Sequence, residues 1–163
     1  MADRKEQRAL LAGLEALLQE YEIETQLSEG ENLLVLRARF NGLGTADGTA
    51  LMEICEYPFT VGEGEPMRLL QFYTTTAENI DEKNLLPALT ALEPVNMRCP
   101  LGAFGIYAPL RQMYHKYTAL LGANPEAEAR SALLAVAEVL DRLFDETIII
   151  ADDAANAAPA RSE

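Results

Sequence analysis

Histidine, cysteine, serine and tryptophan are scarce in this sequence, and their scarcity limits the chemistry it can perform. The 163 residues include one histidine, His115, two cysteines, three serines and no tryptophan. A Ser-His-Asp or Cys-His catalytic device therefore depends on one residue. His115 stands between Tyr114 and Lys116 in a segment that reads as a strand, and a solvent-facing or hydrogen-bonded strand histidine is the ordinary case there. We expect no catalytic residue, and we expect alanine at position 115 to change stability little.

The two cysteines, Cys55 and Cys99, are isolated in the sequence and lack the CxxC spacing of metal knuckles and redox motifs. Unpaired cysteine behaves as a small hydrophobe, so we expect free, mostly buried thiols. The glycine-containing segment 41–48 has no lysine that could meet a phosphate. These patterns predict no metal site and no cofactor.

Positive charge is also in short supply. Thirteen Lys and Arg face 26 Asp and Glu, which leaves a formal charge of −13. Such a field repels phosphate backbones and anionic lipid, so nucleic acid and membrane surfaces are poor partners. Apolar runs such as 148–151 are far shorter than the roughly 20 residues that span a bilayer, and the mixed charges of the first eight residues are not those of a signal peptide. We expect a cytoplasmic protein.

The residues that are abundant predict an α+β fold. Apolar residues make up 49% of the chain, and their spacing alternates between the helical and the strand period. We expect an antiparallel sheet of about five to six strands, with N-terminal, middle and long C-terminal helices, in a single domain over 1–150. The predicted helices cover 4–21, 84–92, with Asn84 as cap and Pro94 as terminator, and a long segment that begins at Asn124; the predicted strands cover 23–27, 33–40, 49–59, 67–76, 95–107 and 111–121. Residues 151–163 show no apolar stripe and are expected to be disordered.

Two predicted strands carry apolar side chains on both faces, which is the least ordinary feature of the sequence. In 49–59 the odd positions include Leu51 and Tyr57, and in 67–76 they include Leu69 and Tyr73. A sheet with one solvated face should alternate cleanly. Either a helix of this chain covers the second face, or these side chains stay half exposed, or a partner binds there. We therefore take these four residues as the candidate protein-binding set.

The order of elements resembles the YbjN-like proteins and the type III secretion chaperone-like fold to which they belong. The most specific stretch is LEPVNMRCPLGAFGI at 92–106, which is similar to the family's "LN, then alternating residues, then G-x-F" strand entry. A tyrosine-rich strand and a long amphipathic helix follow it, and the similarity covers about 4–150. The sequence departs from the family in its longer glycine loop at 41–48 and in having Ala108-Pro109 before the next strand. The resemblance implies an α+β protein that has no catalytic residues, acts by binding proteins and often dimerises.

These observations favour a non-enzymatic bacterial cytoplasmic protein that works by protein–protein contact, as an adaptor, regulator or chaperone-like factor, with another protein or itself as the partner. A secretion chaperone that holds an extended effector segment is one alternative. A small ligand-binding protein or enzyme with a helix–sheet pocket near Tyr114, His115 and Cys99 is another.

Overall fold

The computed structural model describes residues 4–30, 32–60, 62–64 and 67–156. It is an α+β fold with three helices and a six-stranded antiparallel sheet, as the sequence predicted. In chain order the elements are α1 (Arg4–Glu20), β1 (Glu24–Glu29), β2 (Leu34–Leu43), β3 (Gly48–Phe59), β4 (Met67–Ala77), the 3₁₀ turn η1 (Glu82–Asn84), α2 (Leu85–Arg98), β5 (Ala103–Tyr107), the 3₁₀ turn η2 (Ala108–Leu110), β6 (Gln112–Leu121) and α3 (Pro125–Asn156).

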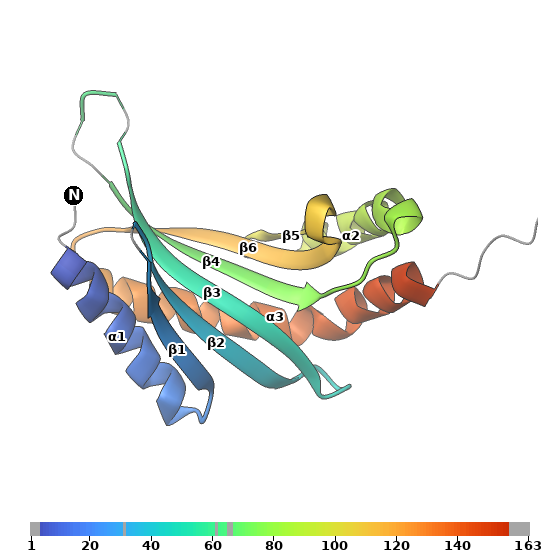
Figure 1. The fold of residues 1–163 in the computed structure, drawn as a ribbon, viewed down its shortest axis with the longest axis horizontal. Coiled ribbons are helices and arrows are strands. Elements are labelled where there is room, and N and C mark those ends of the chain that lie inside the picture. The colour runs from blue at the N-terminus through green and yellow to red at the C-terminus, as the bar shows by residue number, and fades with distance from the viewer. Residues whose placement is uncertain (1–3, 31, 61, 65–66, 157–163) are drawn as a thin grey trace, which may run out of the picture.

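The strands lie in the order β1-β2-β3-β4-β6-β5, and every neighbouring pair is antiparallel. Figure 1 shows a strongly twisted sheet with the long helix α3 running beneath it and α1 beside it at the β1 end. Helix α2 lies at the opposite end, next to β5 and the C-terminal part of α3. The helices therefore gather on one side of the sheet and at its β5 edge.

The core lies between the sheet and helices α1 and α3. Alternation along the strands decides which side chains enter it. The predicted inward set of β2, Leu34, Leu36, Ala38 and Phe40, is buried. The same register buries Met52 and Ile54 of β3 and Leu70 and Phe72 of β4. Helix α1 adds its leucine stripe, and α3 adds Leu133, Val136 and Leu140.

Helix α3 extends beyond the position where we expected regular structure to stop. It continues through Ala151 to Asn156, and both Ala151 and Ala154 are buried. The carbonyl of Ala154 accepts hydrogen bonds from the Asn84 side chain (2.8 Å) and from the backbone N–H of Asp81 (3.3 Å). The expectation of disorder was therefore wrong for 151–156, because alanines form the contact there and leave no large apolar stripe to recognise. Residues 157–163 lie outside the described part of the chain.

Helix α2 corrects two further expectations. Pro94 lies inside the helix, which continues to Arg98, so the expected strand from position 95 begins only at Ala103. Val95 is buried, and Arg98 bonds the Pro94 carbonyl (3.2 Å) and pairs with Glu146 of α3. The helix thus continues past a proline, which lacks the backbone N–H of an ordinary helical residue, and its last turn packs against the core and α3. Asn84 makes no side-chain cap, since its amide is bonded to Ala154 instead.

The turn between β2 and β3 is held by α3. The Asp145 carboxylate accepts bonds from the Thr45 hydroxyl (2.7 Å) and backbone N–H (2.9 Å), and Asp141 accepts one from the Gly44 N–H (2.9 Å). Gly48 lies against the ring of Phe144, and a Cβ at that position would overlap the ring. Hydrogen bonds to its charged form lower the pKa of Asp145.

We predict that truncation separates the two parts of the C-terminus. A chain that ends after Ile150 should lose about 2–4 kcal/mol of unfolding free energy, because it loses two buried alanines and the Ala154 carbonyl. A chain that ends after Asn156 keeps these contacts and is the control. Urea denaturation of both measures the difference; equal midpoints would contradict the role of the last helical turn.

We also predict a pH-dependent contribution from Asp145. Its pKa is lower in the folded chain, so its carboxylate stabilises the fold above the unfolded pKa, and this contribution is lost as pH falls through the folded pKa. The stability difference between the native chain and Asp145→Asn should be largest near pH 7 and should shrink below the ordinary value of 3.8. Urea denaturation at a series of pH values checks this, and a difference that grows on acidification would contradict it.

Candidate functional site

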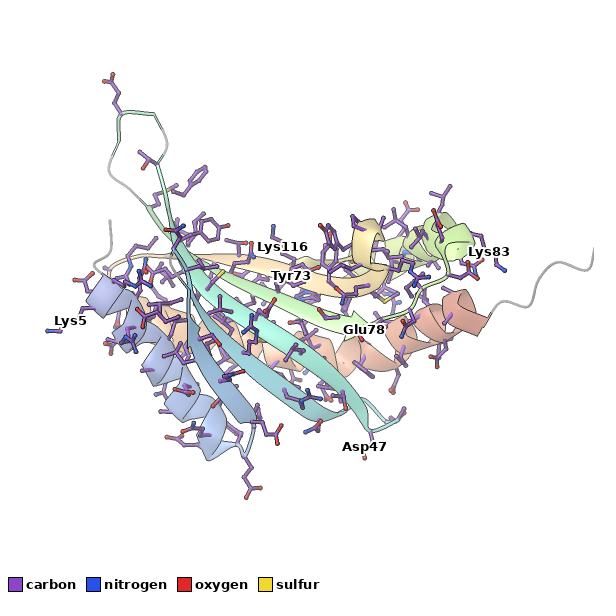
Figure 2. All side chains as sticks on the ribbon, in the orientation of Figure 1. Lys5, Asp47, Tyr73, Glu78, Lys83 and Lys116 are labelled. Atoms are coloured by element: carbon purple, nitrogen blue, oxygen red, sulfur yellow. The ribbon has the colours of Figure 1, made fainter. Side chains whose placement is uncertain are left out.

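The candidate site is the side of the sheet that faces away from α1 and α3, which we call the open face. It carries the strand residues that alternate with the buried set. Leu51 is exposed, while Tyr57, Leu69 and Tyr73 are half-buried. Figure 2 shows Tyr73 and Lys116 on the side of the sheet away from α3. The structure thus places all four predicted residues on one surface, and no helix of the described chain covers it.

The strand register divides these four residues into two groups. Tyr57 of β3 lies directly opposite Leu69 of β4. Tyr73 lies opposite Glu53 on one side and Lys116 on the other, four residues along the strands from the Tyr57–Leu69 pair. Cross-strand neighbours of this kind interact directly. The open face therefore has an apolar end at Tyr57 and Leu69 and an aromatic centre at Tyr73.

The aromatic centre contains two tyrosines, Tyr107 and Tyr114, that lie outside the predicted protein-binding set. The rings of Tyr73 and Tyr114 stack with centroids 4.9 Å apart and an interplanar angle of 24°. Burial, together with the neighbouring Tyr114, Tyr107 and Glu53, raises the pKa of Tyr73. Tyr114 lies opposite Gly105, and the absence of a side chain there makes room for its ring. Tyr107 and Tyr114 could have been found only from the β4–β6–β5 strand order, which local patterns do not contain.

A groove of about 810 Å³ lies at the end of this face where β4 runs toward η2. Its apolar lining comes from Leu51, Tyr73, Tyr107 and Leu110, and its polar lining includes Arg39, Glu53, Glu78 and Gln112. Mixed aromatic, amide and charged linings of this size are typical of surfaces that bind other molecules. Leu51 and Tyr73 thus line a common concave surface, whereas Tyr57 and Leu69 lie beyond it.

The charges of the open face are nearly balanced. Among described strand residues facing this side, the charged ones are Glu24, Arg37, Arg39, Glu53 and Lys116. Arg37 bonds Glu53 at 2.8 Å, and Arg39 lies 3.8 Å from Glu24. The whole chain carries −13. The acidic excess is therefore located elsewhere, and α3 alone carries eight acidic residues against two arginines.

The second candidate, a pocket near Tyr114, His115 and Cys99, is not assembled by the fold. Adjacent strand residues point to opposite faces, so Tyr114 lies on the open face while His115 is fully buried on the core side. His115 Nε2 is 2.8 Å from the Leu101 carbonyl, which the Cys99 thiol also approaches at 3.1 Å. The Cys99 Sγ and His115 Nε2 atoms are 3.8 Å apart. Histidine and thiol thus share one carbonyl as their partner.

The pKa shifts of Cys99 and His115 are opposite to those of an activated cysteine–histidine dyad. Burial lowers the pKa of His115 and raises the pKa of Cys99, so both stay neutral near pH 7. A nucleophilic cysteine needs the thiolate form. Burial and the neighbouring Glu53 also raise the pKa of Cys55. The contacts of His115, including the ring of Phe104 at 4.9 Å, are those of a core side chain.

Within the described ranges, no three His, Cys, Asp or Glu side chains come together in a geometry that could hold a metal ion. None of the described helices is long and apolar enough to cross a bilayer. No protein-family model matches the chain, and no curated protein matches it with significance.

Burial changes the expectation for His115. We predict that His115→Ala lowers the unfolding free energy by about 2–4 kcal/mol, because it leaves a cavity and breaks the contact to Leu101. Since the folded pKa lies below the ordinary 6.5, the native chain loses stability as pH falls below that value, and its advantage over the variant shrinks. Urea denaturation measures both effects, with Lys116→Ala as the exposed control. A change below about 0.5 kcal/mol would contradict this assignment.

Proposed function

We propose that this chain is a non-enzymatic bacterial cytoplasmic protein of the YbjN-like, secretion chaperone-like group, which acts by binding another protein through the open face of its sheet. The observation that carries the proposal is the position of Leu51, Tyr57, Leu69 and Tyr73. All four lie on a face that no described helix covers, and Leu51 is 38% exposed. Partly exposed aromatic and aliphatic side chains on one surface are typical of protein interfaces.

The charge distribution supports the same surface. A chain of charge −13 repels another acidic protein over most of its surface. The strand residues of the open face have three basic and two acidic side chains, so this face is where an acidic partner, including a second copy, meets the least repulsion. We therefore propose self-association as the first interaction to test.

The groove supports the secretion chaperone alternative as a second candidate. Its volume of about 810 Å³ and its lining of Leu51, Tyr73 and Tyr107 suit an extended segment of a partner better than a flat surface would. An enzyme or small-ligand site at Cys99 and His115 has less support, because Tyr114 faces the other side of the sheet and both groups stay neutral near pH 7.

The test is a charge placed at the centre of the open face. We predict that Tyr73→Asp weakens self-association by about tenfold or more, because interface aromatics carry much of the binding energy and the new carboxylate adds repulsion beside Glu53. Sedimentation equilibrium between about 10 and 500 μM measures it, at low and high salt. Screening should strengthen association of the native chain.

The control is Tyr21→Asp, which makes the same substitution at a 63% exposed tyrosine in the turn that follows α1. It should associate like the native chain, and circular dichroism should show both variants folded. A native chain that is monomeric at 500 μM contradicts self-association. Equal binding of a captured cytoplasmic partner by the native chain and Tyr73→Asp would contradict the open face as the binding surface.

A further inference from the structure

The outer side of β6 is only half paired, and this part of the sheet is separate from the open face. Strand β6 covers Gln112–Leu121, and β5 pairs with it only from Gln112 to Lys116. The segment 117–121 has β4 on its inner side. On its outer side, the described residues supply no strand. A free strand edge presents main-chain donors and acceptors to any chain that approaches it.

The hydrogen-bond pattern identifies which groups of this edge are free. Asn96 of α2 bonds both the N–H (2.7 Å) and the carbonyl (2.9 Å) of Phe104, so these groups point away from β6. Phe104 and its partner His115 therefore form a non-hydrogen-bonded pair, and His115 directs its backbone toward β4. By alternation, Thr118 and Leu120 direct their N–H and carbonyl groups outward.

The neighbouring outward groups on either side are satisfied. Lys116 pairs with Ala103 of β5. At the other end, the Gly122 N–H donates to the Glu128 carboxylate, which also accepts from the Asn124 N–H at 3.4 Å. Two donors and two acceptors, those of Thr118 and Leu120, remain between these positions without a partner among the described residues. The side chains of Asn96 and Glu128 thus bond backbone groups on either side, while the outward groups of residues 118–120 stay unpaired within the described chain.

The loop that precedes β5 could pair with β6 at 117–121, but it follows a different path. Continuation of β5 toward its N-terminus would place residues 101 and 99 opposite Thr118 and Leu120. Instead, the Leu101 carbonyl lies 2.8 Å from His115 Nε2 on the core side. Gly102, with φ +71°, makes the turn and packs so closely on the Lys116 carbonyl that a Cβ would overlap it. The buried histidine therefore keeps the edge of β6 open.

A groove of about 450 Å³ accompanies the free edge. Its walls include Leu101, Tyr117 and Ala119 on the sheet side and Ala127, Ala132 and Ala135 on α3. Because alanine side chains are small, they leave space between α3 and β6. This space lies on the core side of the position that an added strand would take. Leu120 contributes to the same lining, although strand alternation directs its 59% exposed side chain to the face opposite Tyr117 and Ala119. A strand placed here would have one row of side chains in the groove and the other beside Leu120.

We propose that the outer edge of β6 at Thr118–Leu120 binds a short extended segment of another protein, which pairs antiparallel to β6 in line with β5. Its main chain forms four hydrogen bonds with Thr118 and Leu120, and alternate apolar side chains enter the groove. The flank of the segment next to Gly122 is basic, because Glu126 and Glu128 lie at the start of α3, whereas the other flank lies next to Lys116.

A second copy of this edge does not fit. Antiparallel pairing of two β6 strands about Ala119 would place Gly122 of the copy opposite Lys116, where Ala103 already pairs. The interval of five residues, 117–121, is about 17 Å long and is closed at both ends. A single extended peptide is the occupant that these dimensions allow, and the proposal is therefore independent of self-association through the open face.

The probe is the synthetic peptide acetyl-KVTVTV-amide, whose valines match the groove, whose two threonines would bond Thr118 and Leu120, and whose last residue lies opposite Tyr117, next to the end of β5. We expect binding, with amide shifts in ¹⁵N-resolved NMR spectra at Thr118 and Leu120 and slower hydrogen exchange of both amides. N-methylation of the two threonine amides should weaken binding about tenfold or more, since it removes two main-chain donors. N-methylation of the central valine alters an amide that points to solvent and should have little effect.

A matched pair of protein variants tests the same contact from the other side. Thr118→Pro removes an outward N–H that β4 does not use, a position where an edge strand tolerates proline. Thr118→Ala keeps the N–H. We expect Thr118→Ala to bind the peptide normally, Thr118→Pro to bind about tenfold more weakly, and Tyr73→Asp to bind normally.

Three results would overturn the proposal. They are absence of binding at millimolar peptide, equal binding of the two methylated peptides by the native chain, and shifts confined to Leu51 and Tyr73 of the open face. The peptide comparison uses the native chain, so it decides the question even where Thr118→Pro fails to fold.

Discussion

The structure depends on one-sided coverage of its sheet by α3. This helix has 32 residues and is therefore about 48 Å long, enough to run from the end of β6 to η1 and α2. Its buried face meets β2, β4 and β6, and its last turn holds Asp81 and Asn84 through the Ala154 carbonyl. Because the helices use one face of the strands, alternation directs every second side chain to the other face. The open face is a geometric consequence of how the core is built.

On the β5 side of the sheet, two side chains bond backbone groups that would otherwise need a neighbouring strand. Asn96 takes the place of a neighbouring strand at Phe104, and Glu128 does so at Gly122. Each depends on a helix end, Asn96 on the last turns of α2 and Glu128 on the first turn of α3. His115 belongs to the same arrangement, because its contact with Leu101 determines the path of the loop from α2 to β5. This contact and the turn at Gly102 hold the loop away from the β6 edge at 117–121.

Much of the fold follows from local periodicity, and the exceptions have physical reasons. The leucine stripe of α1 and the alternation from Leu34 to Phe40 predicted both elements, and the apolar spacing after Asn124 predicted α3. Pro94 is a common helix end in sequence terms, and local sequence does not show that Val95 packs in the core and that the helix continues to Arg98. His115 was expected to contribute little because strand parity alone does not reveal which face a lone polar residue takes. Its burial depends on pairing with β4, which is distant in sequence, as well as with the preceding strand β5.

For the candidate sites, local sequence patterns identify the individual side chains, whereas the strand register determines which of them lie next to one another. Leu51, Tyr57, Leu69 and Tyr73 follow from alternation within two strands, but the contact of Tyr73 with Tyr114 requires β6 to insert between β4 and β5. That same insertion determines the charge of the face. It brings Lys116 beside Tyr73, while the eight acidic residues of α3 stay on the helical part of the molecule. The strand order therefore separates a nearly neutral face from an acidic one, and an interaction that buries the neutral face leaves most of the net charge in solvent, where screening weakens its repulsion.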